Sequence, residues 1–278
     1  VKAMTTGWIR GSCILAVTLA GSGNALSRSV TLGSSRFRSF ANFLLDKQEE
    51  ILKAIEEEDG SGATFARDPW CRDADGSFGI TTCLEDGDLV EKGAASVSIV
   101  HGKLTEDRAR AMSGRRGQPY CAGQKYSAAA LSLVFHSKSP LVPTFRADVR
   151  YFEVEPPEDS TLSSSSSSAT KDSNDGQSAA ASPSPSPAGW FGGGADLTPY
   201  YLFDEDCVGF HQCYRDVCDR HEGRLALPGG SSSQDLENGS SGQDGARSPL
   251  YYTLKQRCDE YFSLPARGEV WVCMVTAG

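Results

Sequence analysis

Residues 143–155 read PTFRADVRYFEVE, and residues 189–199 read GWFGGGADLTP. In the first stretch, small, β-branched and aromatic residues alternate with charged ones, which is typical of a strand with one covered face. Side chains two residues apart share a face of a strand, so Arg146, Asp148 and Arg150 point the same way. Three alternating charges predict either a ligand site or a solvated face on which Asp148 bridges its neighbours.

The second stretch carries three consecutive glycines at 192–194, followed by Ala195 and Asp196. Glycine has no side chain, so the backbone there can approach a flat ligand closely, with the carboxylate of Asp196 beside it. The same pattern also fits a tight loop in which Asp196 caps a turn through Thr198. The residues alone leave both interpretations open.

The rest of the pattern predicts alternating strands and helices. Ser39 can cap a helix whose apolar residues recur at helical spacing until Gly60, and residues 204–221 and 249–262 are two further predicted helices. Short segments rich in β-branched and aromatic residues predict strands at 80–84, 95–100, 129–136 and 146–154. Helices that flank strands predict an α+β fold with a large, mainly antiparallel sheet.

Composition excludes several classes of function. The formal net charge is -9 and the basic residues are scattered, which argues against a nucleic-acid surface. Nine cysteines at irregular spacing do not form a disulfide pattern, so we expect reduced thiols. Cys207, Cys213 and Cys218 lack the paired spacing of a zinc site, and Cys207 and Cys218 would share a helix face with His211. We therefore predict a core stripe there, and no metal.

The N-terminal region has the composition of a targeting leader. No acidic residue precedes Asp46, while basic residues alternate with serine, threonine and small residues. We predict that residues 1–38 form a disordered leader to a plastid or mitochondrion, with the cytoplasm as the alternative, and that residues 39–278 form the domain. The apolar run at 12–20 is too short to span a membrane, which takes about 20 residues.

Two tracts within the domain are rich in serine, alanine, glycine and proline, at residues 156–188 and 229–248. Such segments cannot bury enough apolar surface to offset the entropy lost on ordering. Both are predicted to be disordered insertions.

Five ordered stretches resemble oxygen-dependent coproporphyrinogen oxidase, an enzyme family of haem biosynthesis. Besides the two stretches quoted first, they are FGITTCLEDGDLVEKGAASVSIVHGKL at 78–104, HSKSPLVPT at 136–144 and LKQRCDEYF at 254–262. The resemblance implies a seven-stranded sheet flanked by helices, and a homodimer formed partly by a C-terminal portion. Beyond Glu269 that portion has no counterpart here, so the fold is expected to be incomplete at the C-terminus.

The resemblance also implies a site. At the positions of Arg146, Asp148 and Arg150 the family has His, Asn and Arg, which line the substrate site, with the histidine as proton donor. Ser132 matches a substrate-contacting position, and Asp196 matches an aspartate that faces the pyrrole nitrogens. We therefore assign Asp196 and Arg146 as catalytic, and Ser132, Asp148 and Arg150 as substrate-binding. A guanidinium stays protonated near neutral pH, so Arg146 can bind a carboxylate but cannot shuttle a proton.

The reaction that the resemblance implies is oxidative decarboxylation of coproporphyrinogen III to protoporphyrinogen IX by dioxygen, without a metal or organic cofactor. The expected partners are coproporphyrinogen III and a second subunit, with no nucleic acid and no membrane span. The alternative is a catalytically impaired paralogue that binds a porphyrin or a protein partner, or a truncated gene product. It is suggested because Arg146, Asp148 and Gly209 depart together from the His, Asn and His of the family.

Overall fold

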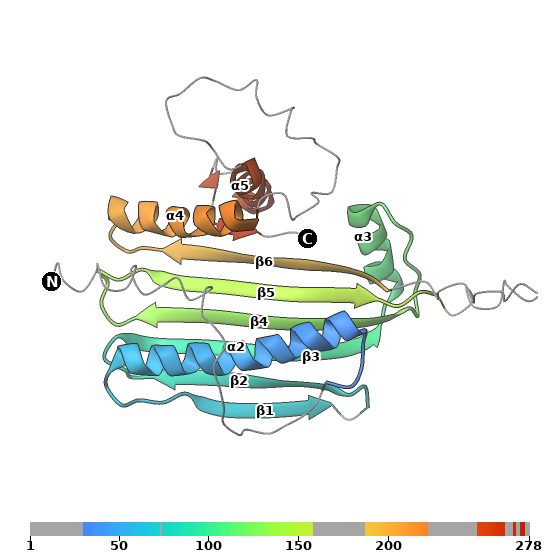
Figure 1. Ribbon diagram of the computed structural model, residues 1–278, viewed down its shortest axis with the longest axis horizontal. Coiled ribbons are helices and arrows are strands. Elements are labelled where there is room, and N and C mark those ends of the chain that lie inside the picture. Colours follow the sequence, from blue (N-terminus) through green and yellow to red (C-terminus); the bar gives the residue numbers. More distant parts are fainter. Residues whose placement is uncertain are drawn as a thin grey trace, which may run out of the picture.

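The structure is a computed structural model that describes residues 30–72, 74–157, 187–221, 249–264, 269–270 and 273–275. These residues form an α+β fold built on a seven-stranded antiparallel sheet in the order β1-β2-β3-β4-β5-β6-β9 (Figure 1). From β1 to β6 each strand pairs with the next one in the sequence. The predicted fold class is confirmed.

The strands of the large sheet are β1 (Ala66–Arg72), β2 (Ser77–Glu85), β3 (Val90–Lys103), β4 (Lys125–Ser137), β5 (Thr144–Val154), β6 (Ala188–Thr198) and β9 (Cys273–Val275). A separate pairing joins β7 (Ser263–Leu264) to β8 (Glu269–Val270). The helices are α2 (Ser35–Asp59), α3 (Glu106–Arg116), α4 (Asp204–His221) and α5 (Pro249–Phe262).

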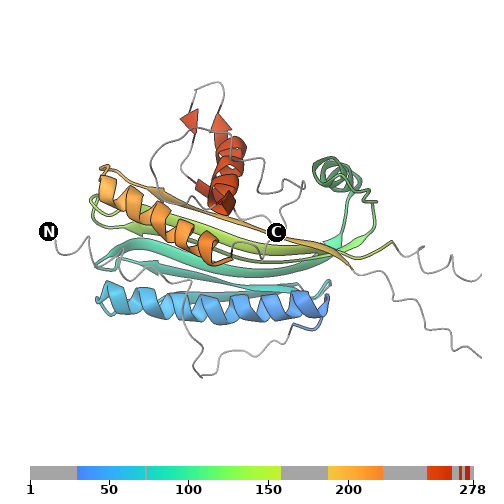
Figure 2. The same ribbon diagram turned by 45° about the horizontal axis from the view of Figure 1, so that its top comes forward.

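Helix α2 and helix α3 lie on opposite sides of the sheet, as Figure 2 shows, whereas α4 and α5 lie beside its β6 end (Figure 1). Helix α2 packs along β3, β4 and β5. Among the described helices, none combines the length and the apolar character that a membrane crossing requires.

Helix α2 starts earlier than predicted. Its N-cap is Ser34, not Ser39: the Ser34 hydroxyl accepts a hydrogen bond from the Phe37 N–H at 3.1 Å. The same hydroxyl donates to the buried carboxylate of Glu153 on β5 at 2.6 Å, so a contact from a distant strand fixes the start of the helix. Phe37 is fully buried, and the end of the predicted leader therefore belongs to the fold. Gly60 ends the helix in the left-handed conformation, as predicted.

The main core lies between α2 and one face of the sheet. Its buried side chains come from alternate strand positions and from one stripe of the helix: Val30, Phe37, Ala41, Leu44, Val97, Ile99, Ala129, Leu131 and Tyr151. Because successive strand residues point to opposite faces, this packing leaves the residues between them on the other face. We call that other face, opposite α2, the open face.

The structure confirms the predicted strands β2 to β5 and the helices α4 and α5. Strands β1 and β6 and helix α3 were not predicted. The glycine run is not a tight loop but the middle of β6, which pairs with β5 along its whole length. A side chain at Gly193 would place its Cβ 2.4 Å from the Asp148 carbonyl oxygen, so this close pairing requires glycine. Most of the two predicted insertions, residues 158–186 and 229–248, lies outside the described residues.

Candidate active site

Strand register gathers the predicted site residues on the open face. Ser132 on β4 pairs with Asp148 on β5, which in turn pairs with Gly194 on β6. Two residues along each strand, at the next position on the same face, Arg146 pairs with Asp196. Paired residues of antiparallel strands present their side chains on the same face, so these residues form one continuous area.

The centre of this area is an ion pair across two strands. The Arg146 Nη2 lies 3.2 Å from Asp196 Oδ2, and the Thr198 hydroxyl donates to Asp196 Oδ1 at 2.8 Å. The Asp196 side chain is 13% exposed, whereas that of Arg146 is 56% exposed. Asp196 is thus a carboxylate fixed at both oxygens, and Arg146 offers its outer edge to an incoming anion.

A second ion pair begins two residues further along β5, at Asp148. Arg150 Nη1 is 2.5 Å from Asp148 Oδ2, and both side chains remain partly exposed. The Arg150 guanidinium also lies over Gly192, where an added Cβ would come within 3.3 Å of its Nε. Glycine at this position therefore gives the guanidinium room to lie flat on β6. The hypothesis that Asp148 bridges both neighbours is wrong, because Arg146 pairs with Asp196 instead.

Beside these charges, several positions of the open face on β3, β4 and β6 carry short side chains or none. On β3 and β4 the register pairs Ser96 with Ser132 and Ser98 with Ala130. Together with the glycines of β6 they form a low surface next to four charged side chains. A flat, polyanionic ligand could lie on the short residues while its acidic groups reach the arginines.

Helix α3 supplies two more arginines at one end of the open face. The Arg116 guanidinium lies 4.2 Å from the centre of the Trp190 ring, and that of Arg108 lies 5.4 Å from the Phe152 ring. Both rings belong to the open face, since Phe152 follows Arg150 by two residues and pairs with Trp190. Stacked arginines keep their charge while their position is fixed.

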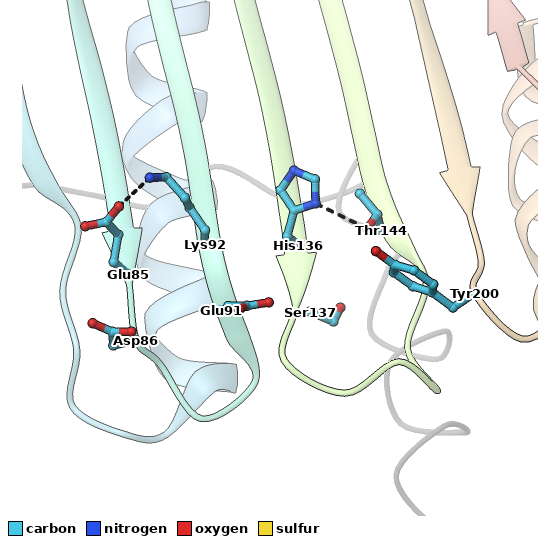
Figure 3. Close-up of a pocket in the computed structure, with 8 residues that line it drawn as sticks. All are labelled: Glu85, Asp86, Glu91, Lys92, His136, Ser137, Thr144 and Tyr200. Carbon is cyan, nitrogen blue, oxygen red and sulfur yellow. Dashed lines mark hydrogen bonds and ion pairs between the residues drawn. The ribbon is translucent and has the colours of Figure 1, made fainter.

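The other end of the open face contains a cavity of about 500 Å³ (Figure 3). Its lining includes His136 at the end of β4, Thr144 at the start of β5, and Tyr200 from the segment after β6. The Thr144 hydroxyl and His136 Nδ1 are 3.4 Å apart. Lys92, which pairs with His136 in the register, forms an ion pair of 2.5 Å with Glu85.

His211, which was predicted to share a core stripe with Cys207 and Cys218, has a hydrogen-bond partner in the structure. Its Nδ1 lies 2.9 Å from the Tyr251 hydroxyl, between α4 and α5. Burial lowers the pKa of the His211 imidazole, and the positive charges of Lys255 and Arg215 add to this effect. Within the part of the chain that the structure describes, no three metal-ligating side chains come together.

Sequence reasoning missed Arg108, Arg116 and His136 as members of this face. The signal for His136 was present, because it lies four residues after Ser132 on the same strand and so shares its face. The α3 arginines had no such signal, because the helix itself was not predicted.

These features define a class of protein: an antiparallel sheet that holds a carboxylate fixed by an arginine and a threonine, on a face with further arginines that suits a flat polyanion. The sequence model of the family described as coproporphyrinogen III oxidase matches residues 39–226. The chain belongs to the coproporphyrinogen III oxidase family.

Individual relatives agree with this assignment. A human protein named "Oxygen-dependent coproporphyrinogen-III oxidase, mitochondrial" is 34% identical over 234 residues, which cover 81% of this chain and 38% of the human protein. The mouse protein of the same name is 33% identical, with 81% and 40% covered. A soybean (Glycine max) protein, "Oxygen-dependent coproporphyrinogen-III oxidase, chloroplastic", is 31% identical, with 83% and 47% covered. The chain thus spans less than half the length of these relatives.

Proposed function

We propose that this chain provides the substrate face of an oxygen-dependent coproporphyrinogen III oxidase. The reaction converts two propionate chains of coproporphyrinogen III to vinyl groups, releases carbon dioxide and yields protoporphyrinogen IX. For each propionate, dioxygen accepts two electrons from the C–H and C–C bonds that break, with the electron-rich pyrrole ring assisting their transfer, and no metal or organic cofactor takes part. The observation that carries this proposal is the carboxylate of Asp196, held by Arg146 and Thr198 on a face that also carries Arg150 and the glycines of β6.

Each site residue then has a role that follows from its position. Asp196 accepts hydrogen bonds from the pyrrole N–H groups and favours their deprotonation, which makes the ring a better electron donor to dioxygen. Arg150 and Arg146 hold propionate carboxylates through paired N–H donors. Ser132 and Asp148 border the porphyrinogen ring between the two arginines. Asp148 also keeps the Arg150 guanidinium oriented through its ion pair.

The first test is turnover by the full chain and by Asp196→Asn. Anaerobically prepared coproporphyrinogen III is mixed with oxygenated protein, and vinyl products are separated by chromatography. Asparagine keeps the shape of the side chain but lacks the charge, so we expect kcat to fall about 100-fold. Asp107→Asn on the exposed side of α3 is the matched control, and equal losses in both variants would contradict the assignment.

A second candidate function is porphyrin binding without turnover, and the ion pair between Arg146 and Asp196 favours it. The guanidinium occupies one oxygen of the carboxylate that should meet the pyrroles. In that case the wild-type chain binds coproporphyrin III, measured by fluorescence quenching, but forms no vinyl product. Gain of turnover in Arg146→His would then identify Arg146 as the cause.

The leader and the oligomeric state belong to the same proposal. We propose that the part of the predicted leader that precedes the described fold, residues 1–29, directs the protein to an organelle; the human and soybean relatives are named mitochondrial and chloroplastic. Fusion of these residues to a fluorescent protein tests this. We also propose a homodimer, which light scattering of the full-length protein measures.

A further inference from the structure

His136 is the one histidine on the open face. The chain has four histidines, and the structure describes all of them. The ring of His101 packs against Phe37 on the α2 side of the sheet, His211 lies between α4 and α5, and His221 is the last residue of α4. Among the four histidines of this chain, His136 is therefore the one whose imidazole faces a ligand of the open face.

The register places His136 beside the central ion pair. The pairing of Phe135 with Phe145 places His136 opposite Thr144 on β5. Arg146 lies two residues after Thr144 on the same strand face, so His136 and Arg146 are diagonal neighbours on adjacent strands. Such neighbours lie about 7–8 Å apart. A ligand that touches Arg146 and Asp196 thus comes within reach of the imidazole.

The surroundings of His136 suit a group that exchanges protons with solvent. The side chain is exposed, borders the cavity of about 500 Å³, and has Thr144 beside its Nδ1. The charged residues that line the cavity with it are Lys92 and Glu91 from β3, Glu85 at the end of β2, and Asp86 after it. Arg146 on β5 is its diagonal neighbour. Figure 3 shows the residues that line the cavity, with the carboxylates on one side of the His136 ring and Tyr200 on the other.

For each propionate, the proposed reaction consumes one proton, and the substrate itself does not supply it. For each propionate, two electrons pass to dioxygen, a C–H bond breaks, and the C–C bond to the carboxylate breaks to release carbon dioxide. The proton from the C–H bond produces the hydroperoxide anion, which needs one more proton to leave as hydrogen peroxide. Arg146 cannot give this proton, because a guanidinium does not titrate near neutral pH.

We propose that His136 is the catalytic proton donor of this face: its imidazolium protonates the departing hydroperoxide and is reloaded from solvent through the cavity beside Tyr200. The inference rests on the proposed oxidase function and adds a residue to its machinery. Histidine is the side chain that most readily gives and regains a proton near neutral pH.

The test compares wild type with His136→Gln in the full chain. We expect kcat for vinyl formation to fall about 100-fold, while the affinity for oxidised coproporphyrin III and the midpoint of thermal unfolding stay the same. In His136→Gly, added imidazole should restore part of the turnover, and the restored rate should follow the fraction of imidazolium as pH changes. A residue with a purely structural role would not show this rescue.

His221→Gln is the matched control, because it removes an exposed imidazole from the end of α4. Unchanged kcat in His136→Gln, or the same loss in His221→Gln, overturns the role of His136 and leaves the oxidase function standing. A wild-type chain that binds coproporphyrin III but makes no vinyl product overturns the oxidase function, and this inference with it.

Discussion

Asp59 is the last residue of α2, and its carboxylate joins the helix to the turn between β2 and β3. It accepts hydrogen bonds from the N–H groups of Leu89 and Val90 at 2.8 Å and of Asp88 at 3.1 Å, and from the Ser61 hydroxyl. Burial alone would raise the pKa of this carboxyl, but these hydrogen bonds outweigh burial and lower it to about 2. The ionised form is therefore part of the fold.

We expect Asp59→Asn to lower the free energy of unfolding by about 2–3 kcal/mol, because an amide turns one acceptor oxygen into a donor that faces N–H groups. Urea denaturation monitored by circular dichroism measures the change. Glu57→Gln on the same helix is the control, since its ion pair with Lys53 is exposed and 3.7 Å long, so less than about 0.5 kcal/mol should be lost. Equal losses in the two variants would contradict the role of Asp59.

Helix α3 forms one wall of the open face, and its arginines differ in direction. Arg108 stacks over Tyr126 at 4.6 Å on the sheet side, whereas Arg110 pairs with Glu106 and Asp107 in solvent. Of these two arginines, Arg108 is the one that adds positive potential where a polyanion would bind. We expect Arg108→Met to raise the Kd for coproporphyrin III about 3- to 10-fold at low salt, because one partly screened charge contributes about 1 kcal/mol.

The matched variant Arg110→Met removes the same charge from the same helix and should leave the Kd nearly unchanged. Fluorescence titration at two salt concentrations measures both variants. An equal effect of the two would mean that net charge alone, and not the wall beside Phe152, decides affinity.

How far the sequence predicts each element depends on which force decides it. Strands β2 to β5 alternate because one face is buried by α2, so the pattern was visible. Strand β6 contains a glycine run, and glycine has low strand propensity; only pairing with β5 makes it extended. Strand β1 includes Pro69 and lies at the sheet edge, and α3 buries little beyond Ala109 and Met112, so neither shows clear periodicity.

For the site, the sequence predicts which residues share a strand face but not which side chains they contact. Arg146, Asp148 and Arg150 share a strand face by spacing alone, but spacing does not tell which partner each one meets. The pairing of Arg146 with Asp196 depends on the register between β5 and a strand that was not predicted. His136 stayed unassigned because its neighbours come from β3, β5 and the segment after β6.

The stability of the fold should fall with acid in two separate steps, and the first depends on His101. Burial lowers the pKa of this imidazole below its ordinary 6.5, although the nearby carboxylates of Asp75, Glu153 and Glu155 partly oppose the shift. Because the unfolded chain binds the proton more readily, the stabilisation is complete above pH 6.5 and is lost as pH falls below it. His211, whose pKa burial also lowers, contributes in the same direction. The Asp59 carboxylate adds the second step, below its ordinary value of 3.8 and towards 2.

Urea denaturation at pH 7.5, 6.0, 5.0 and 3.5 tests this order. The free energy of unfolding should decline between pH 6.5 and 5 in wild type. His101→Gln should be less stable at pH 7.5, because Gln replaces a ring packed on Phe37 and hydrogen-bonded to Ser127, yet its decline with pH should be weaker. His221→Gln is the control, because it removes an exposed imidazole from the end of α4 and leaves His101 in place. His101→Gln removes one imidazole and no other group that binds protons. If the free energy of unfolding of this variant still declined with acid as much as that of wild type, the acid sensitivity would have to arise from another group.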